Sequence, residues 1–283
     1  MATSVHTCWV SGLAAVLIIA VLAGGCTQQT GDNQQTTLKV TGSTTVLPIA
    51  QAAADAYGKD HASADIQVTG GGSSVGVQAV GKGTADIGMS SRDLKAEENT
   101  KYPGLVVTTI ANDGIALIVH PTNTVPGLTL AQVREIYAGN VTNWKDVGGP
   151  DQVIVVIGRD SASGTREFFS EKVMNQQNYT RTQLEKNSNG AVQQTITQTP
   201  GAIGYVGLGY IDSQIKAVPI IVNGEPVMPS IANVLNKKYP ISRPLLMITK
   251  GAPTGLAKDY IDYILSPAGQ KIIADEGFVP ITT

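Results

Sequence analysis

The stretch VIVVIGRDSASGTREFFSEKVM, residues 153–174, joins an apolar run to a segment with helical spacing. The run VIVVI is typical of a buried strand, and REFFSEKVM is typical of a helix. Between them, GRDSASGT (residues 158–165) holds an arginine, an aspartate, two serines, a threonine and two glycines. In open α/β sheets, ligands bind at the carboxyl ends of the strands, where such a turn lies. The stretch therefore predicts an α/β fold with a ligand site at this turn.

Three turns in the first third of the chain have the same character. They are GSTT (residues 42–45), GGSS (residues 71–74) and MSSR (residues 89–92). Each follows a predicted strand, and the first two precede predicted helices, the second of which we expect Ser73 or Ser74 to cap. This repeated order of strand, turn and helix predicts parallel, doubly wound sheets.

The four turns together predict an anion site. A helix N-terminus offers free N–H groups and a partial positive charge, and hydroxyl groups add further donors. The forked guanidinium of an arginine suits a tetrahedral oxyanion. A phosphate accepts on the order of a dozen hydrogen bonds, and its dehydration is costly unless nearly all of them are replaced. One such turn alone is usually only a helix cap, whereas four can supply that number.

The middle of the chain predicts two lobes. The β-rich segment at residues 105–121, which we expect to be broken at residues 112–114, can leave one lobe and enter the other. A second strand at residues 244–251 can cross back. We expect residues 38–111 and 245–283 to form the first lobe and residues 112–244 the second. A ligand can favour the closed state only if it binds that state better than the open one, and contacts from both lobes provide this difference.

Composition limits the class of protein. The chain has 283 residues, a formal net charge of −2, 42% hydrophobic residues and 15% charged residues. The apolar content is enough for a folded core, and the small charge gives no indication of a nucleic-acid partner. We expect a monomer without cofactor or metal.

The N-terminus predicts export. Residues 9–25 carry no charge and are somewhat short for a membrane span, so they are typical of a signal peptide. Cys26 follows Leu22-Ala23-Gly24-Gly25, which resembles a lipobox with lipidation at Cys26. The leader lacks a Lys or Arg before its apolar core, and Leu22 lies four residues before the cysteine, so an uncleaved anchor helix is the alternative. Residues 27–37 are expected to form a flexible tether outside the cytoplasmic membrane, at the cell surface or in the periplasm.

Six ordered motifs resemble the substrate-binding protein of phosphate ABC importers, in the shorter branch of that family. They are TGSTTVLPIA, GGGSSVGVQAVGKGTADIGMSSR, TNWKDVGG, GRDSASGTREFF, GAIGYVGLGY and PISRPLLMITKG, and the match runs from residue 38 to residue 281. The resemblance implies a two-lobed periplasmic-binding-protein fold of the type II-like class, with two hinge crossovers. It also implies a dehydrated inorganic phosphate held between the lobes and delivered to an ABC permease.

The resemblance further implies the ligand residues. In the first lobe they are Thr44, Thr45, Ser73 with Ser74 beside it, and Ser91, and in the second lobe Arg159, Ser163, Gly164 and Thr165. Arg92, next to Ser91, is expected to add a second cation. Longer members of the family carry an aspartate where this chain has Ser91, so selectivity against sulfate or arsenate is left open. Our hypothesis is that Asp160 orients Arg159, and the alternative is that Asp160 itself accepts the proton of the phosphate.

Three other functions stay open. The site could take another tetrahedral oxyanion such as sulfate or molybdate, or the protein could report phosphate to a membrane kinase. A secreted phosphatase or hydrolase is a weaker alternative, because His61 and His120 are the only histidines after the leader, and no G-x-S-x-G or metal-ligand pattern is present. We therefore expect no enzyme.

Overall fold

The computed structural model describes residues 36–281. The predicted signal peptide (residues 1–26), the lipidation of Cys26 and residues 27–35 of the predicted tether lie outside these residues. The last two residues of the predicted tether, Thr36 and Thr37, belong to a strand instead, so the tether prediction is wrong there. Among residues 36–281, no helix is both long enough and apolar enough to cross a membrane.

The first lobe begins with the predicted alternation of strands and helices. Its elements are β1 (Thr36–Gly42), α1 (Leu47–Asp60), β2 (Ala64–Gly70), α2 (Ser73–Lys82), β3 (Ile87–Ser90) and α3 (Ala96–Lys101). β1 lies between β2 and β3 and is parallel to both. The prediction of parallel strands is therefore confirmed here, and the turns that follow β1, β2 and β3 lie at one edge of the sheet.

The end of the chain returns to the first lobe. Helices α8 (Gly255–Leu265) and α9 (Pro267–Asp275) and the short strand β12 (Val279–Pro280) follow the last long strand. Side chains of these helices share one buried cluster with Ile49 and Ala53 of α1. The hydroxyl of Tyr260 in α8 donates to the backbone oxygen of Ala50 at 2.6 Å. Two segments from opposite ends of the sequence thus complete one core.

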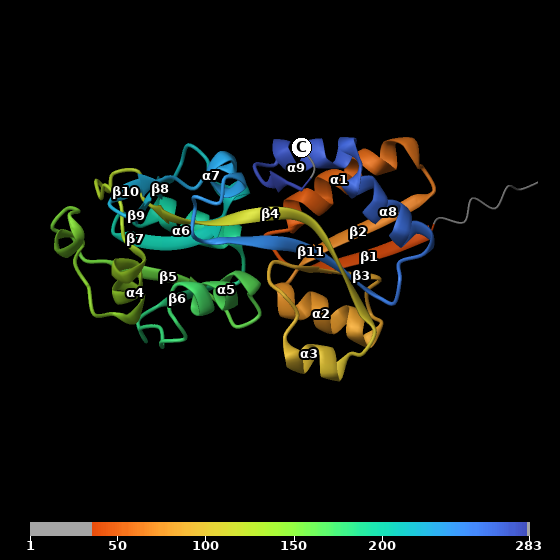
Figure 1. Ribbon diagram of the computed structural model, residues 1–283, viewed down its shortest axis with the longest axis horizontal. Helices are drawn as coiled ribbons and strands as arrows, with labels where there is room; N and C mark the ends of the chain where they lie inside the picture. Colours follow the sequence, from red (N-terminus) through yellow and green to blue (C-terminus); the bar gives the residue numbers. More distant parts are fainter. Residues whose placement is uncertain (1–35, 282–283) are drawn as a thin grey trace, which may run out of the picture. The chain divides into compact units, whose positions relative to one another are not determined.

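Two long antiparallel strands run through both lobes (Figure 1). β4 (Leu105–Val119) and β11 (Ser242–Lys250) pair with each other from Gly114 opposite Ser242 to Leu105 opposite Lys250. The predicted break of β4 at residues 112–114 is wrong, because Asp113 pairs directly with Arg243 and the ladder continues through it. The register shifts nearby instead, because Leu245 pairs with Ala111 and Leu246 with Thr109, which leaves Ile110 of β4 without a partner in the ladder.

The second lobe is built on the far half of β4, which pairs with β7. Its elements are α4 (Leu130–Ala138), η1 (Trp144–Val147), β5 (Val155–Arg159), α5 (Gly164–Lys172), β6 (Leu184–Lys186), α6 (Asn189–Gln198), β7 (Ala202–Gly207), η2 (Leu208–Tyr210), β8 (Lys216–Val218), β9 (Ile220–Val222), β10 (Glu225–Val227) and α7 (Ile231–Leu235). β5 is parallel to both β6 and β7. The sheet path is β2-β1-β3-β11-β4-β7-β5-β6, so β4 joins the strands of the two lobes into one path.

The buried side chains follow the same division. One cluster draws on residues 38–111 and 245–278, and the other two draw on residues 115–241 together with Val279. The second lobe packs aromatic rings at its centre, with Phe169 stacked on Tyr205 at 4.2 Å between ring centroids. Each lobe therefore has its own core, and polar side chains are left to meet between the cores.

Candidate anion-binding site

The four donor-rich turns meet where the two lobes touch. Thr45 Oγ1, in the turn after β1, lies 3.1 Å from Thr165 Oγ1 in α5 of the second lobe. The backbone N–H of Ser74 donates across the same boundary to the oxygen of Ala162 at 3.2 Å. The N–H of Ser91, after β3, donates to Ser73 Oγ at 3.1 Å. All four turns thus contribute to one buried polar region.

The start of α2 differs from the prediction. Gly72 is the N-cap residue, with φ at 98°, and no side chain caps the helix, so the predicted capping by Ser73 or Ser74 is wrong. A positive φ favours glycine, and here the chain turns too closely against Ala162 for a side chain at residue 72. Because the backbone makes the turn, the Ser73 and Ser74 hydroxyls are available for other contacts. In α5, by contrast, Ser163 is the N-cap and accepts from the N–H of Arg166 at 3.2 Å.

Arg159 is the buried cation of this region, with only 1% of its surface exposed. Its Nε donates to the backbone oxygen of Lys186 at 3.2 Å, and its Nη2 donates to the oxygen of Asn187 at 3.3 Å and to Thr44 Oγ1 at 3.2 Å. Nη1 is buried and has no hydrogen-bond partner among residues 36–281. Burial lowers the pKa of Arg159, since no carboxylate pairs with it directly. A fixed guanidinium with a spare donor is well suited to an oxyanion.

Asp160 does not hold Arg159 by a hydrogen bond. The backbone oxygens of Lys186 and Asn187 hold the guanidinium instead, and Asp160 Oδ1 is buried without a partner in the described part of the chain. Asp160 acts on Arg159 through its charge, which raises the pKa of the arginine against the larger effect of burial. The hypothesis that Asp160 orients Arg159 therefore has no hydrogen bond to support it.

Arg92 forms ion pairs with two carboxylates. Its two terminal nitrogens bind Glu98 at 2.7 and 2.8 Å, and its Nε lies 2.6 Å from a carboxylate oxygen of Glu167. Glu167 belongs to α5 in the second lobe and also pairs with Lys95 of the first lobe at 2.9 Å. Ser74 Oγ accepts from Arg92 at 3.1 Å. Arg92 and Ser74 thus take part in a contact between the lobes.

The structure adds polar residues that the sequence did not indicate. Asn189 at the start of α6 is fully buried and donates to both Thr44 Oγ1 and Thr45 Oγ1. The Tyr210 hydroxyl donates to the backbone oxygen of Thr44. Arg243 and Asp113, both fully buried, form an ion pair at 2.9 Å beside Thr45. The turn Ser188-Asn189-Gly190 repeats the strand–turn–helix pattern and could have been noticed, whereas Asp113 and Arg243 lie in no such pattern.

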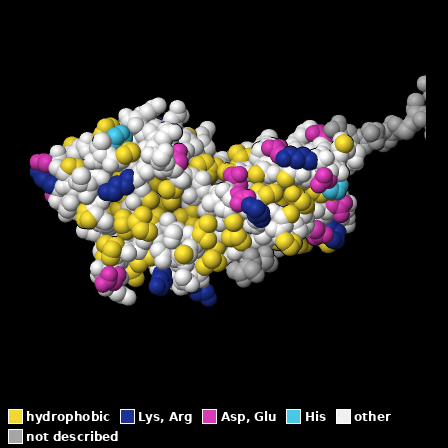
Figure 2. Space-filling view, turned by 90° about the horizontal axis from the view of Figure 1, so that it is seen from above, with side chains coloured by type: hydrophobic (Ala, Val, Ile, Leu, Met, Phe, Trp, Pro, Cys, Tyr) yellow, Lys and Arg dark blue, Asp and Glu magenta, His cyan; other side chains and the backbone are white. Residues whose placement is uncertain are grey.

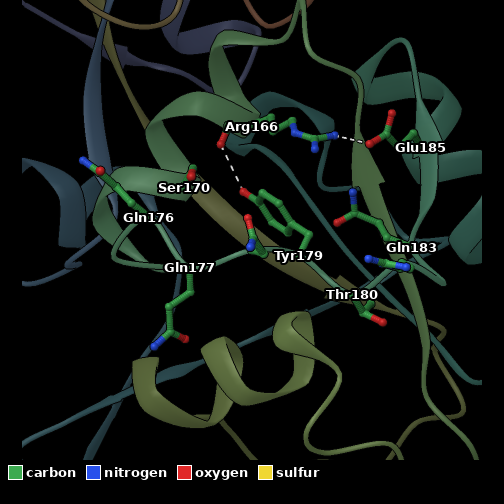
Figure 3. Close-up of a pocket in the computed structure, with 10 residues that line it drawn as sticks. Arg166, Ser170, Gln176, Gln177, Tyr179, Thr180, Gln183 and Glu185 are labelled. Atoms are coloured by element: carbon green, nitrogen blue, oxygen red, sulfur yellow. Dashed lines mark hydrogen bonds and ion pairs between the residues drawn. The ribbon is translucent and has the colours of Figure 1, made fainter.

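A separate pocket of about 610 Å³ lies in the second lobe (Figure 3). Arg166 there binds Glu185, and the Tyr179 hydroxyl donates to the backbone oxygen of Arg166 at 3.2 Å. None of the predicted ligand residues lines this pocket. Residues 36–281 contain no group of three or more His, Cys, Asp or Glu side chains that could hold a metal ion.

Charge on the outside contrasts with charge in the site. On the face shown in Figure 2, basic and acidic side chains occur in small scattered groups of both signs. Between the lobes, Arg92, Arg159 and Arg243 are all buried. Glu98 and Glu167 pair with Arg92 and Asp113 pairs with Arg243, which leaves Arg159 as the buried arginine without a direct ion pair in the described chain.

Residues 27–268 match the family model described as a PBP superfamily domain. The phosphate-binding protein PstS of Bacillus subtilis is 33% identical over 281 residues, which cover 95% of this chain and 92% of that protein. PstS of Borreliella burgdorferi is 32% identical, over 89% of this chain and 92% of the relative. Among solved structures, a Clostridium perfringens protein assigned as a phosphate ABC transporter substrate-binding protein, with bound phosphate, is 39% identical. Its TM-score is 0.82, over 87% of this chain and 100% of that one.

Proposed function

This chain belongs to the PBP superfamily and to the PstS family of phosphate-binding proteins, and we propose that it captures inorganic phosphate between its lobes for an ABC permease. The relatives named above are phosphate-binding proteins, and the similar Clostridium perfringens structure holds phosphate. The observation in this chain that carries the proposal is the buried Arg159, whose Nη1 is unpartnered within residues 36–281 and whose Nη2 contacts a hydroxyl of the opposite lobe.

The proposed phosphate contacts come from both lobes. They are Thr44, Thr45, Ser73 and Ser91 in the first lobe, and Arg159, Ser163, Gly164 and Thr165 in the second. Arg92 and Ser74 are assigned to the contact between lobes, because two carboxylates already neutralise Arg92. We propose that residues 38–111 with 245–283, and residues 112–244, move as two bodies joined by β4 and β11. The closed state then has a lower free energy relative to the open state when a bound ligand contacts both bodies.

Titration calorimetry on the ligand-stripped protein tests the function. We expect one phosphate to bind per chain with a dissociation constant of about 1 μM or tighter, equivalent to about 8 kcal/mol. Sulfate and arsenate, titrated in parallel, define the selectivity that the absence of an aspartate at residue 91 left open. Binding of sulfate or molybdate with no response to phosphate would move the function to another oxyanion importer.

We propose a carrier without hydrolytic activity. His61 stacks on Tyr57 at 3.9 Å, and the Nδ1 of His120 hydrogen-bonds the Thr122 hydroxyl at 2.8 Å. Neither histidine hydrogen-bonds a residue of the four turns within the described chain, so neither is placed to activate a nucleophile there. Sustained turnover of a chromogenic phosphate ester by the purified protein would overturn this view.

We propose that the protein is exported and held at the membrane by a lipid on Cys26. The supporting observation is the uncharged segment at residues 9–25 followed by a lipobox-like sequence. Mass spectrometry of the N-terminal peptide from membranes is expected to show a lipidated Cys26, whereas an intact leader would support the anchor helix.

Gly164→Ala is expected to weaken phosphate binding by about 1–3 kcal/mol, through overpacking between the lobes. A methyl group at residue 164 would lie 2.2 Å from Ser73 Oγ and 2.8 Å from Ser73 Cβ, so α5 and α2 must move apart. Gly190→Ala is a matched control, because a methyl group at the start of α6 meets nothing within 4 Å. Calorimetry compares the two variants, and equal affinities for both would contradict a close contact between lobes at Gly164.

Glu167→Gln is expected to lower phosphate affinity by about threefold to tenfold, because it removes a charge that joins the lobes. Glu167 pairs with Arg92 and Lys95 of the first lobe, and its side chain is 22% exposed. Salt screens such a pair, so the difference from the unsubstituted protein should shrink between about 0.05 and 0.5 M salt. Glu171→Gln on the exposed side of α5 is the control. A difference that does not change with salt would argue against an electrostatic contact.

A further inference from the structure

We propose that Asn189 is a positioning residue that fixes the direction of the Thr44 and Thr45 hydroxyls, so that both can only donate to the ligand. The inference rests on the proposed function and concerns the same site. Asn189 is fully buried at the start of α6 in the second lobe, and both threonines belong to the first lobe. No local sequence pattern connects them, since Asn189 lies 144 and 145 residues away.

A backbone contact determines which way the Asn189 amide faces. The N–H of Gly207 lies 3.3 Å from Asn189 Oδ1. A backbone N–H can only donate, so the amide oxygen must face Gly207 and the NH₂ group must face away. Nδ2 has two hydrogens, and it lies 3.1 Å from Thr44 Oγ1 and 3.0 Å from Thr45 Oγ1. Each of the two hydrogens therefore bonds to a different threonine hydroxyl.

The Thr44 hydroxyl has no acceptor capacity left. A hydroxyl accepts two hydrogen bonds and donates one. Thr44 Oγ1 accepts from Asn189 Nδ2 and from Arg159 Nη2, at 3.1 and 3.2 Å. Its own hydrogen is donated to no acceptor within residues 36–281. This hydroxyl is thus a donor beside the buried guanidinium of Arg159.

The Thr45 hydroxyl is committed in the same way. It accepts from Asn189 Nδ2 at 3.0 Å and from Arg243 Nη2 at 3.3 Å. The other contact of Arg243 Nη2 is the carboxylate of Asp113 at 2.9 Å, which holds the guanidinium in place. The hydrogen of Thr45 can then point only toward Thr165 Oγ1, at 3.1 Å, or toward a bound anion. Its oxygen offers no lone pair to a ligand.

This arrangement favours ligand oxygens that accept hydrogen bonds. A hydroxyl that is free to rotate can present either its hydrogen or its lone pairs, and binding must then fix its direction at a cost. Here the direction is already set, but only while the second lobe brings Asn189 against the first. Closure of the lobes therefore turns two neutral hydroxyls into oriented donors for the deprotonated oxygens of an oxyanion.

Two substitutions at residue 189 separate this role from simple packing. Asn189→Ala removes both donors and leaves the threonines free to rotate. Asn189→Asp keeps the shape but replaces the donors by acceptors, so the hydroxyls should donate to the carboxylate instead of the phosphate. Protonation of that carboxylate at low pH removes its charge and one of its acceptor sites, which should restore part of the affinity.

The experiment is calorimetric titration of inorganic phosphate into four proteins: the unsubstituted chain, N189A, N189D and the control Gln194→Glu. Gln194 lies on the exposed side of α6, so Q194E makes the same amide-to-carboxylate change away from the site. At about pH 8 we expect affinity to fall about tenfold in N189A and about a hundredfold in N189D, with Q194E unchanged. Toward about pH 5, N189D should approach N189A.

Thr44→Val tests the same inference independently, and it remains usable if the Asn189 variants do not fold. It removes the hydroxyl with little change of shape, and Thr44→Ser keeps the hydroxyl. We expect T44V to lose affinity and T44S to retain it, and the double variant T44V/N189A to lose less than the sum of the single losses. If the unsubstituted protein binds phosphate but N189D equals N189A at every pH, or the double variant is additive, the inference is wrong. If the unsubstituted protein does not bind phosphate, the proposed function itself fails.

Discussion

Replacing Arg159 by alanine is expected to weaken phosphate binding by about 2–5 kcal/mol, because the anion would be buried without its main counter-charge. Arg159 is the buried arginine of the site that no carboxylate pairs with directly in the described chain. Its guanidinium is fixed by two backbone oxygens, so the folded protein holds it ready for the ligand. Calorimetry with phosphate measures the loss directly.

Two further variants make the result specific. Arg159→Lys keeps the charge but loses the planar fork, so its affinity should lie between those of the alanine variant and the unsubstituted protein. Arg181→Ala is a control, because Arg181 is exposed and lies at the separate pocket of the second lobe. A loss of less than about tenfold in R159A would mean that this arginine lies at the margin of the site.

Asp113→Ala is expected to lower the free energy of unfolding by about 3–5 kcal/mol, because it leaves the Arg243 guanidinium buried without a partner. Both side chains of this pair are fully buried, and Asp113 also accepts the N–H of Leu208 at 2.9 Å. Burial raises the pKa of Asp113 and lowers the pKa of Arg243, because it removes water from the charged form of each group. Urea unfolding measures the change from the shift of its midpoint.

A double variant separates the lost charge pair from lost packing. Asp113→Asn combined with Arg243→Met removes both charges and puts neutral side chains of similar size in their place. We expect it to be more stable than Asp113→Ala, since no charge is left unpaired. If the double variant is as unstable as the single one, the cost comes from packing between β4 and β11 and not from an uncompensated arginine.

The parts of the fold and site that the sequence predicted are local. A donor-rich turn between an apolar run and a helix can be recognised within about a dozen residues, and the turns after β1, β2 and β3 follow parallel strands and so lie at one sheet edge. Thr45 shows why the rest could not be predicted. Its hydroxyl contacts Thr165, Asn189 and Arg243, which lie 120, 144 and 198 residues further along the chain.

The errors have the same origin. Ser73 and Ser74 have the residue type of a helix cap, but close contact with the other lobe gives that position to Gly72. Asn112-Asp113-Gly114 has the composition of a turn, but the pairing of Asp113 with Arg243 keeps it inside a strand. In both cases a contact from far along the chain outweighs the local preference.

The joining of both chain ends in the first lobe has a consequence for the order of folding. The core of the second lobe draws almost entirely on residues 115–241, whereas the first needs α1 together with α8 and α9. The contact of Ala50 with Tyr260 closes a loop of 210 residues, with a chain-entropy cost of about 5 kcal/mol that falls by only about 0.6 kcal/mol for each halving of the loop. Contacts between such distant residues slow folding. When the chain is delivered N-terminus first, at synthesis or during export, the second lobe can therefore assemble while the apolar side of α1 stays uncovered until the last forty or so residues arrive. The first helix of the described residues to be synthesised, α1, is therefore among the last to be covered.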